Sequence, residues 1–331
     1  MFLYERKENF IRILGCLTCD GVIKVPEQVE GLPVTELAPY VFSSGTGKDE
    51  VMEKLAGNIL WCEDDGTALS HGQAEQQECY WKGKGVPVSQ ADLPDSIIRV
   101  GRYGFYNCSS LSRLSFSSRI KDLEAGVFTG CSHLSYLKVR VDEQRRSCLQ
   151  EVLSELRHQL TVEYICSRGK ALLLFPEMFE ESVENTPARI IMREMHGCGH
   201  MYRYCFDQSQ FQFHRYDSLF PHIKVQEPER TVVQLAMGRL RYPLGLQPQY
   251  ESVYETYLRE HIEETVKEVM AGRNMEQISW LAVRLGDTRE NLDRMIEEGN
   301  KAGLMEAVSL LMDQRHRQFG VKKKRFSLED F

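Results

Sequence analysis

Apolar and polar positions repeat at a fixed interval in the first half of the chain. The segment YGFYNCSSLSRLSF, residues 103–116, returns as GVFTGCSHLSYLKV, residues 126–139. The matched positions lie 23 residues apart: Phe105 and Phe128, Cys108 and Cys131, Leu111 and Leu134, Leu114 and Leu137, and Phe116 and Val139. A repeat of this length predicts a solenoid, in which stacked turns each add one strand to a common sheet.

The end of each repeat reads as a strand with one buried and one exposed face. Leu114 and Phe116, like their counterparts 23 residues later, alternate with polar residues and therefore share the inner face. The residues between them face outward, and we expect these to form a protein-binding surface because aromatic and Arg side chains commonly carry binding energy. The candidates are Arg113, Ser115, Tyr136, Lys138 and Arg140. A plain solvated face is equally compatible with them.

The residue pattern of the repeat resembles the BspA-like class of leucine-rich repeats, which is found mainly in bacterial proteins. In each copy an apolar residue precedes Phe by five places, and x-x-Cys and Ser-x-Leu follow. A degenerate upstream copy supplies Val34, Leu37 and Phe42. The resemblance covers residues 10–44 and 93–140. It implies a solenoid whose surface binds protein, and in this context Cys108 and Cys131 should form a buried structural ladder.

The predicted fold class is α+β, with a short leucine-rich repeat solenoid followed by a mostly helical domain. We assign residues 1–140 to the solenoid, with an inserted loop at 45–92 that is rich in Gly, Gln, Glu and Asp. Residues 141–185 should form an α/β cap. Its helix would bury Leu149, Val152, Leu153, Leu156 and Leu160, and the segments TVEYI and ALLLF would be strands.

Residues 186–331 are predicted to be mostly helical. The stretch from Tyr202 to Phe213 alternates aromatic and polar residues, which suits either a hairpin turning at 207–210 or a helix. Three short helices follow Gly272, and the pairs Asn274 with Gln277 and Asp287 with Glu290 have capping-box spacing. Successive short helices joined by Gly-containing turns resemble ankyrin or armadillo helix pairs in architecture, although the ankyrin TPLHxA signature is absent.

Charge and composition narrow the range of partners. The formal net charge of −7 argues against nucleic acid or an anionic membrane as the main partner. No apolar run approaches the roughly 20 residues that a membrane helix needs. The opening residues carry charges before any apolar run, which is unlike a secretory signal peptide. We therefore expect a cytoplasmic protein with reduced cysteines and no cofactor.

A cluster of metal-binding residue types gives the alternative hypothesis. His196, Cys198, His200 and Cys205 lie within ten residues, and thiolates with imidazoles can form a tetrahedral zinc site. Their spacing matches no structural zinc motif, and the two intervening glycines favour a turn. The sequence nominates no nucleophile and base pair. It therefore favours a non-enzymatic protein-interaction scaffold over a metal-binding protein or metal-dependent enzyme. In a third possibility, the helical region is the real binding platform.

Overall fold

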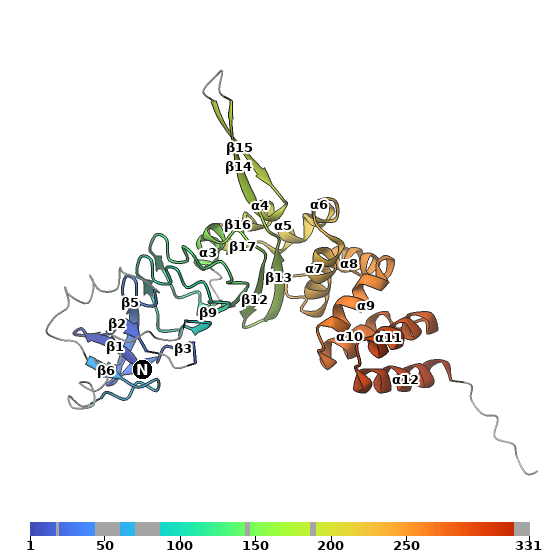
Figure 1. Ribbon diagram of the computed structural model, residues 1–331, viewed down its shortest axis with the longest axis horizontal. Coiled ribbons are helices and arrows are strands. Elements are labelled where there is room, and N and C mark those ends of the chain that lie inside the picture. Colours follow the sequence, from blue (N-terminus) through green and yellow to red (C-terminus); the bar gives the residue numbers. More distant parts are fainter. Residues whose placement is uncertain (18–19, 44–59, 70–86, 143–145, 186–189, 321–331) are drawn as a thin grey trace, which may run out of the picture. The chain divides into compact units, whose positions relative to one another are not determined.

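The computed structural model describes residues 1–17, 20–43, 60–69, 87–142, 146–185 and 190–320. The chain forms two compact units. Unit 1 comprises Met1–Glu227 and Tyr242–Gln247, and unit 2 comprises Pro228–Arg241 and the residues from Pro248 onward. Unit 1 contains a β-solenoid of about five turns, and most of the ten described helices follow the solenoid (Figure 1). The fold is α+β, as predicted.

The main sheet of the solenoid has the strand order β13-β12-β11-β9-β7-β3. Its strands are β3 (Val22–Lys24), β7 (Gln90–Asp92), β9 (Arg113–Ser117), β11 (Tyr136–Arg140), β12 (Leu160–Cys166) and β13 (Gly169–Phe175). Neighbours from β3 to β12 are parallel, and β13 closes the sheet antiparallel. The register aligns one inner row, which is Ile23, Ala91, Leu114, Leu137 and Val162. All five side chains of this row are buried, as the repeat predicts.

A second sheet closes the other side of the turns. Its path runs β10-β8-β5-β2-β1-β6, and β4 pairs with β5. The strands are β1 (Phe2–Arg6), β2 (Ile11–Cys16), β4 (Gln28–Val29), β5 (Leu32–Leu37), β6 (Leu60–Cys62), β8 (Arg99–Val100) and β10 (Asp122–Leu123). The sequence predicts an inserted loop at 45–92, but two strands lie within this range. Strand β6 pairs with β1 in the second sheet, and β7 belongs to the main sheet, so the insertion is shorter than predicted. Residues 44–59 and 70–86 of that insertion lie outside the described residues.

Buried phenylalanines and cysteines join successive turns. The ring centroids of Phe42 and Phe105 lie 5.0 Å apart, and those of Phe105 and Phe128 lie 5.7 Å apart. The Cys108 thiol donates to the Phe42 carbonyl, and the Cys131 thiol donates to the Phe105 carbonyl, each over 3.1 Å. The expected cysteine ladder is confirmed, and each thiol is bound to the preceding turn. Burial raises the pKa of Cys131 to about 12.

The last turn of the solenoid is capped by a carboxylate. In the turn before it, the Tyr103 and Phe105 amides donate to the carbonyls of Ala125 and Val127. The equivalent amides 23 residues later, at Gly126 and Phe128, have no following turn to receive them. They donate instead to the two carboxylate oxygens of Glu155, over 3.1 and 2.9 Å. Glu155 therefore replaces the missing turn.

Glu155 ends the helix α3 (Leu149–Glu155), and this helix with β12 and β13 provides the elements predicted for 141–185. The helix buries Leu149, Val152 and Leu153. Leu156 is its C-cap and Leu160 begins β12, so both are buried outside the helix. The division of the chain into three domains at residues 140 and 185 stays a prediction.

The expectation of mostly helical structure from residue 186 is wrong at its start. Strands β14 (Phe179–Asn185) and β15 (Ile190–His196) pair as an antiparallel hairpin. The short helix α4 (Gly199–Arg203) follows, so Tyr202 is helical and Tyr204 is the C-cap. Strands β16 (Phe206–Asp207) and β17 (Gln210–Phe211) then form the hairpin predicted at 207–210. Its turn residues Gln208 and Ser209 both have positive φ. The last helices of unit 1 are α5 (Phe213–Ser218) and α6 (Phe220–Gln226).

Unit 2 is a succession of amphipathic helices. They are α7 (Glu229–Arg241), α8 (Pro248–Glu260), α9 (Ile262–Ala271), α10 (Met275–Leu285), α11 (Arg289–Lys301) and α12 (Met305–Phe319). Helix α7 packs on α8 and α9, α9 packs on α11, and α12 packs on α10 and α11. The predicted cap at Asn274 is confirmed, since its side chain accepts from the Gln277 amide over 3.0 Å. The cap of α11 is Thr288 rather than Asp287. The ankyrin or armadillo likeness stays a prediction.

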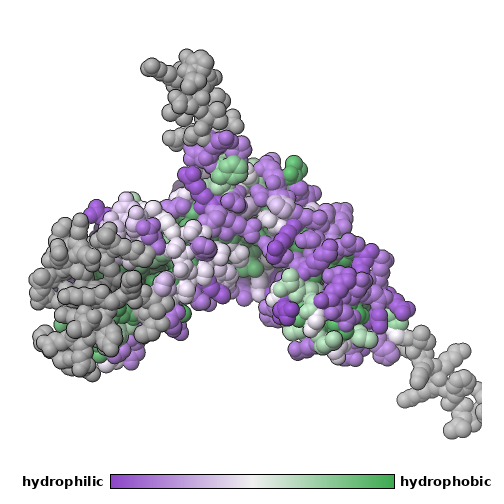
Figure 2. Space-filling model, in the orientation of Figure 1, coloured by the Kyte–Doolittle hydropathy of each residue, from purple (hydrophilic) through white to green (hydrophobic). Residues whose placement is uncertain are grey.

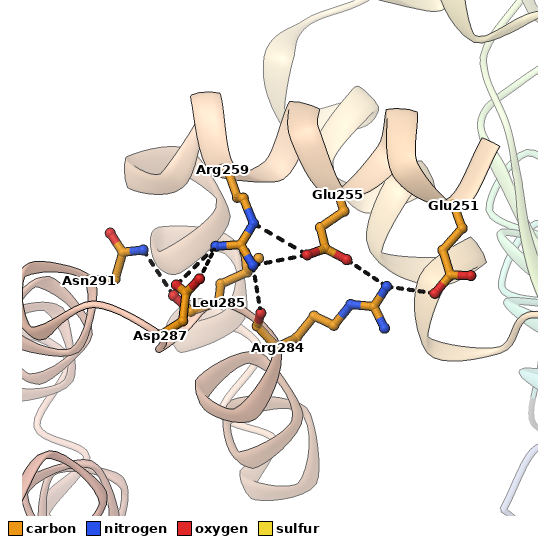
Figure 3. A network of polar contacts seen from close by, with 7 residues as sticks. All are labelled: Glu251, Glu255, Arg259, Arg284, Leu285, Asp287 and Asn291. Carbon is orange, nitrogen blue, oxygen red and sulfur yellow. Dashed lines mark hydrogen bonds and ion pairs between the residues drawn. The ribbon is translucent and has the colours of Figure 1, made fainter. Parts of the chain in front are cut away.

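Asp287 instead belongs to a network of ion pairs between helices α8 and α10 (Figure 3). Arg259 binds Asp287 over 2.9 Å and Glu255 over 2.9 Å, and it donates to the Arg284 carbonyl. The Arg284 guanidinium lies 2.6 Å from both Glu251 and Glu255. Burial alone would raise the pKa of Glu255, but the two arginines lower it below its usual range. The network therefore ties α8 to the C-terminal end of α10, two helices of unit 2 that are separated along the chain by α9.

Candidate protein-binding face of the solenoid

All five residues predicted as a binding surface lie on one side of the main sheet. In the strand register, Tyr136 lies opposite Arg113, Lys138 opposite Ser115, and Arg140 opposite Ser117. The same side carries Lys24 and Asp92 from earlier strands and Glu163 and Lys170 from later ones. We call this side the open face. Besides the buried Ser117 and Leu174, its members are Val22, Lys24, Gln90, Asp92, Arg113, Ser115, Tyr136, Lys138, Arg140, Thr161, Glu163, Ile165, Lys170 and Leu172.

A chain of polar contacts crosses the open face through Tyr136. The Arg113 guanidinium lies 4.5 Å from the centroid of the Tyr136 ring, and the Tyr136 hydroxyl donates to Glu163 over 2.8 Å. Lys170 lies 3.3 Å from a Glu163 oxygen and 4.2 Å from the Tyr242 ring centroid. Each side chain fixes the next, so the face is preorganised rather than a set of independent, freely rotating groups.

The chain of contacts changes the titration of two groups. Burial and the hydrogen bond to Glu163 raise the pKa of Tyr136 to about 12. Burial alone would raise the pKa of Glu163, but hydrogen bonds from Tyr136 and Lys170 lower it below its usual range. Tyr136 is therefore a neutral donor and Glu163 a carboxylate at neutral pH.

Arg140 stabilises the fold more than it offers a free binding group. Its guanidinium binds the Asp95 carboxylate over 2.8 Å and the Leu93 carbonyl over 2.6 Å. It also donates to the Ser115 hydroxyl and lies 3.5 Å from Asp92. These contacts join β11 to the turn that follows β7. Of the five predicted residues, Arg140 and Ser115 are thus hydrogen-bonded to each other. Strand alternation predicts that both face outward but does not predict this bond.

Lys138 and Arg113 are the two predicted cations that are exposed and have no ion pair within 4 Å among the described residues. The Lys138 side chain lies between Ser115 and Glu163 in the register. Glu163 is already bound by Tyr136 and Lys170. The charge of Lys138 is available to a partner.

The structure does not assemble the alternative metal site. His196 stacks on Phe179, with ring centroids 4.8 Å apart, and lies 3.1 Å from Glu181. The other three candidates bind separate groups: Cys198 donates to Glu227, His200 pairs with the Gly197 carbonyl, and Cys205 donates to the Met201 carbonyl. No group of three His, Cys, Asp or Glu residues that could hold a metal ion occurs in the described part of the chain. The turn that the two glycines favour is present, because Gly197 has a positive φ and Gly199 begins the helix α4.

A buried arginine near this segment was missed by the sequence reasoning. Arg203 is only 3% exposed, and its guanidinium donates to the carbonyls of Leu153, Leu156, His158, Pro176 and Gly199. Burial lowers its pKa to about 10. Arg203 therefore joins α3 and α4 to the end of β13. A single Arg among aromatic residues carries no sequence signal of this role, whereas strand alternation in TVEYI could have placed Glu163 on the open face.

Polar residues cover most of the described surface on the side of the molecule shown in Figure 2. The repeats bury their Leu, Val and Phe side chains. No helix among the described residues has both the length and the apolar character required to cross a bilayer. Eight cysteines in the described ranges are free thiols.

The stacked turns, the 23-residue register and the parallel main sheet define a leucine-rich repeat solenoid. Residues 83–167 match the family model described as BspA type Leucine rich repeat region, with six copies. This confirms the resemblance for residues 93–140, and the match extends neither to the upstream copy at 10–44 nor to the helices of unit 2.

Two solved structures are similar to parts of the chain. One is a leucine rich cell surface protein from Faecalibacterium prausnitzii A2-165, with 19% identity over 44% of this chain and a TM-score of 0.25. The chain covers 33% of that structure. The other is the T. pallidum Leucine Rich Repeat protein, which is 19% identical to this chain and has a TM-score of 0.21. That match covers 50% of this chain and 80% of the T. pallidum chain. No curated protein matches the chain. The fold assignment therefore rests on the repeats and strands of this chain itself.

Proposed function

We propose that the protein is a non-enzymatic interaction module that binds a protein partner on the open face. The observation that carries the proposal is the preorganised contact chain from the exposed Arg113 through Tyr136 to Glu163, of which the last two are half-buried. Leucine-rich repeat domains generally mediate protein–protein interaction, and rigid aromatic and Arg side chains are frequent binding anchors. A bacterial cytoplasmic setting is part of the proposal: the BspA-type repeat supports a bacterial source, and cysteines that form no disulfide with one another in the described ranges suit a reducing compartment.

Site-specific photo-crosslinking in the native cell tests the proposal. A photoreactive phenylalanine analogue at Ser115 would report the open face, and the same analogue at Thr129, exposed in the turn that precedes β11, would be the control. We expect a discrete crosslinked protein from position 115, absent from position 129 and weakened by Tyr136→Ala. Equal crosslinking from both positions, or none from position 115, would contradict the proposal.

A second candidate surface lies on helix α12. Met305, Met312 and Phe319 are 70%, 47% and 38% exposed and recur at helical spacing on one side of this helix. An exposed apolar stripe of this kind suits a partner helix. Under this alternative, the helical region rather than the open face would be the main protein-binding surface. A crosslink from position 312, with none from position 115, would favour it over the open face.

A further inference from the structure

The charges of the open face are unevenly compensated. Its cations are Lys24, Arg113, Lys138, Arg140 and Lys170, and its carboxylates are Asp92 and Glu163, with Asp95 beside it. Arg140 binds Asp95 and lies 3.5 Å from Asp92, while Lys170 and the Tyr136 hydroxyl bind Glu163. All three carboxylates are therefore already engaged within the protein.

Three cations of the open face form no close ion pair among the described residues. Lys24, Arg113 and Lys138 are exposed, and none of them has an ion pair within 4 Å among the residues that the structure describes. The Arg113 guanidinium lies against the face of the Tyr136 ring, which leaves its N–H groups open to solvent. This excess of positive charge is local, because the whole chain carries a formal net charge of −7.

We propose that the partner bound by the open face presents an extended acidic segment; this inference rests on the function proposed above. Charge complementarity selects an anionic occupant. Nucleic acid is the less favourable anion, since its binding usually neutralises several phosphates, commonly six or more, and the protein is acidic overall.

The spacing of the three cations fits an extended peptide. Lys24 and Lys138 lie in the same register row, three strands apart, which corresponds to about 14 Å at the usual strand separation. Arg113 and Lys138 are diagonal neighbours, about 7–8 Å apart at the backbone. Alternate side chains of an extended chain are spaced by roughly 7 Å and every fourth by roughly 13 Å. Arg113 lies about 12 Å from Lys24 and to one side of the line between the two lysines. Carboxylates at positions i and i+4 of the partner would therefore meet the two lysines, and the long Arg113 side chain would reach the carboxylate at i+2 from the side.

Fluorescence anisotropy with defined peptides tests this inference. The probe is a fluorescein-labelled decapeptide of alternating Glu and Ser, and its twin has Gln in place of Glu. We expect the Glu peptide to bind the full-length protein at 50 mM salt at least tenfold more tightly than the Gln peptide. Its affinity should fall at least tenfold in 500 mM salt.

Charge reversal identifies the responsible surface. Lys138→Glu and Arg113→Glu should each lower the affinity for the Glu peptide at least tenfold, and Lys138→Gln should lower it about threefold. Lys121→Glu makes the same change in net charge at an exposed residue outside the main sheet and should change affinity less than twofold. Circular dichroism would confirm that each variant is folded.

The outcomes separate this inference from the proposed function. Equal binding of the two peptides, or equal loss in Lys121→Glu, would overturn the acidic-segment inference. A protein crosslinked at position 115 whose binding is unchanged by Lys138→Glu would overturn it while leaving the proposed function intact. No crosslink, together with no peptide binding, would overturn both.

Discussion

The Glu155 cap predicts that one carboxylate controls the stability of the end of the solenoid. Glu155→Ala removes the acceptor for two backbone amides, and Phe128, which supplies one of them, is buried. A buried donor left without a partner costs about 1–3 kcal/mol, whereas water can partly replace the bond at Gly126, which is half-buried. We therefore expect a loss of about 2–4 kcal/mol in the local free energy of opening.

Hydrogen exchange measured by mass spectrometry reports this opening directly. A loss of 2–4 kcal/mol corresponds to roughly 30- to 800-fold faster exchange of the Gly126 and Phe128 amides. Glu155→Gln separates hydrogen bonding from packing, because its amide keeps the shape but has only one acceptor oxygen. We expect it to lie between wild type and Glu155→Ala. Glu151→Gln, at an exposed position of the same helix, is the matched control and should change exchange less than threefold.

Two results would refute the reasoning about the cap. Unchanged exchange at Gly126 and Phe128 in Glu155→Ala would show that the two amides do not depend on the carboxylate. Wild-type exchange in Glu155→Gln would show that the second oxygen contributes nothing.

Three further predictions concern buried and paired groups. Arg203→Met should destabilise unit 1 by about 3–5 kcal/mol in urea unfolding, because five carbonyls lose their donor, and a change below 1 kcal/mol would contradict this. Cys131 should not react with a thiol reagent at pH 8 until the protein unfolds, since it is buried with a pKa of about 12. Glu255 has a lowered pKa, so its stabilisation is present above its ordinary pKa of 4.5 and is lost as pH falls through the folded value. The midpoint temperature of thermal unfolding, followed by the circular dichroism signal of the helices, should therefore fall more steeply toward pH 3 in wild type than in Glu255→Gln. The same dependence of this temperature on pH in both proteins would contradict the role of Arg259 and Arg284.

The solenoid could be predicted from the sequence because each of its turns repeats the same local solution. Matching apolar residues 23 positions apart determined which side chains of β9 and β11 are buried, and alternation then placed Arg113, Tyr136 and Lys138 on the other side. The hairpin of β14 and β15 escaped prediction because its strands lack a clear alternation, and two-stranded pairing depends on contacts between segments rather than on local pattern.

The sequence by itself determined the repeat, its inner and outer faces and the buried cysteines, since these follow from the period of apolar residues. Only the tertiary structure decided what the outward side chains do. Arg140 folds back onto Asp95 and Ser115, while Lys138 forms no ion pair in the described part of the chain, although both lie on the same strand and the same face. Glu155 likewise gains its role from the end of a neighbouring turn, 27 residues away from Phe128. Which charges remain for a partner depends on such long-range pairings, and a local pattern carries no record of them.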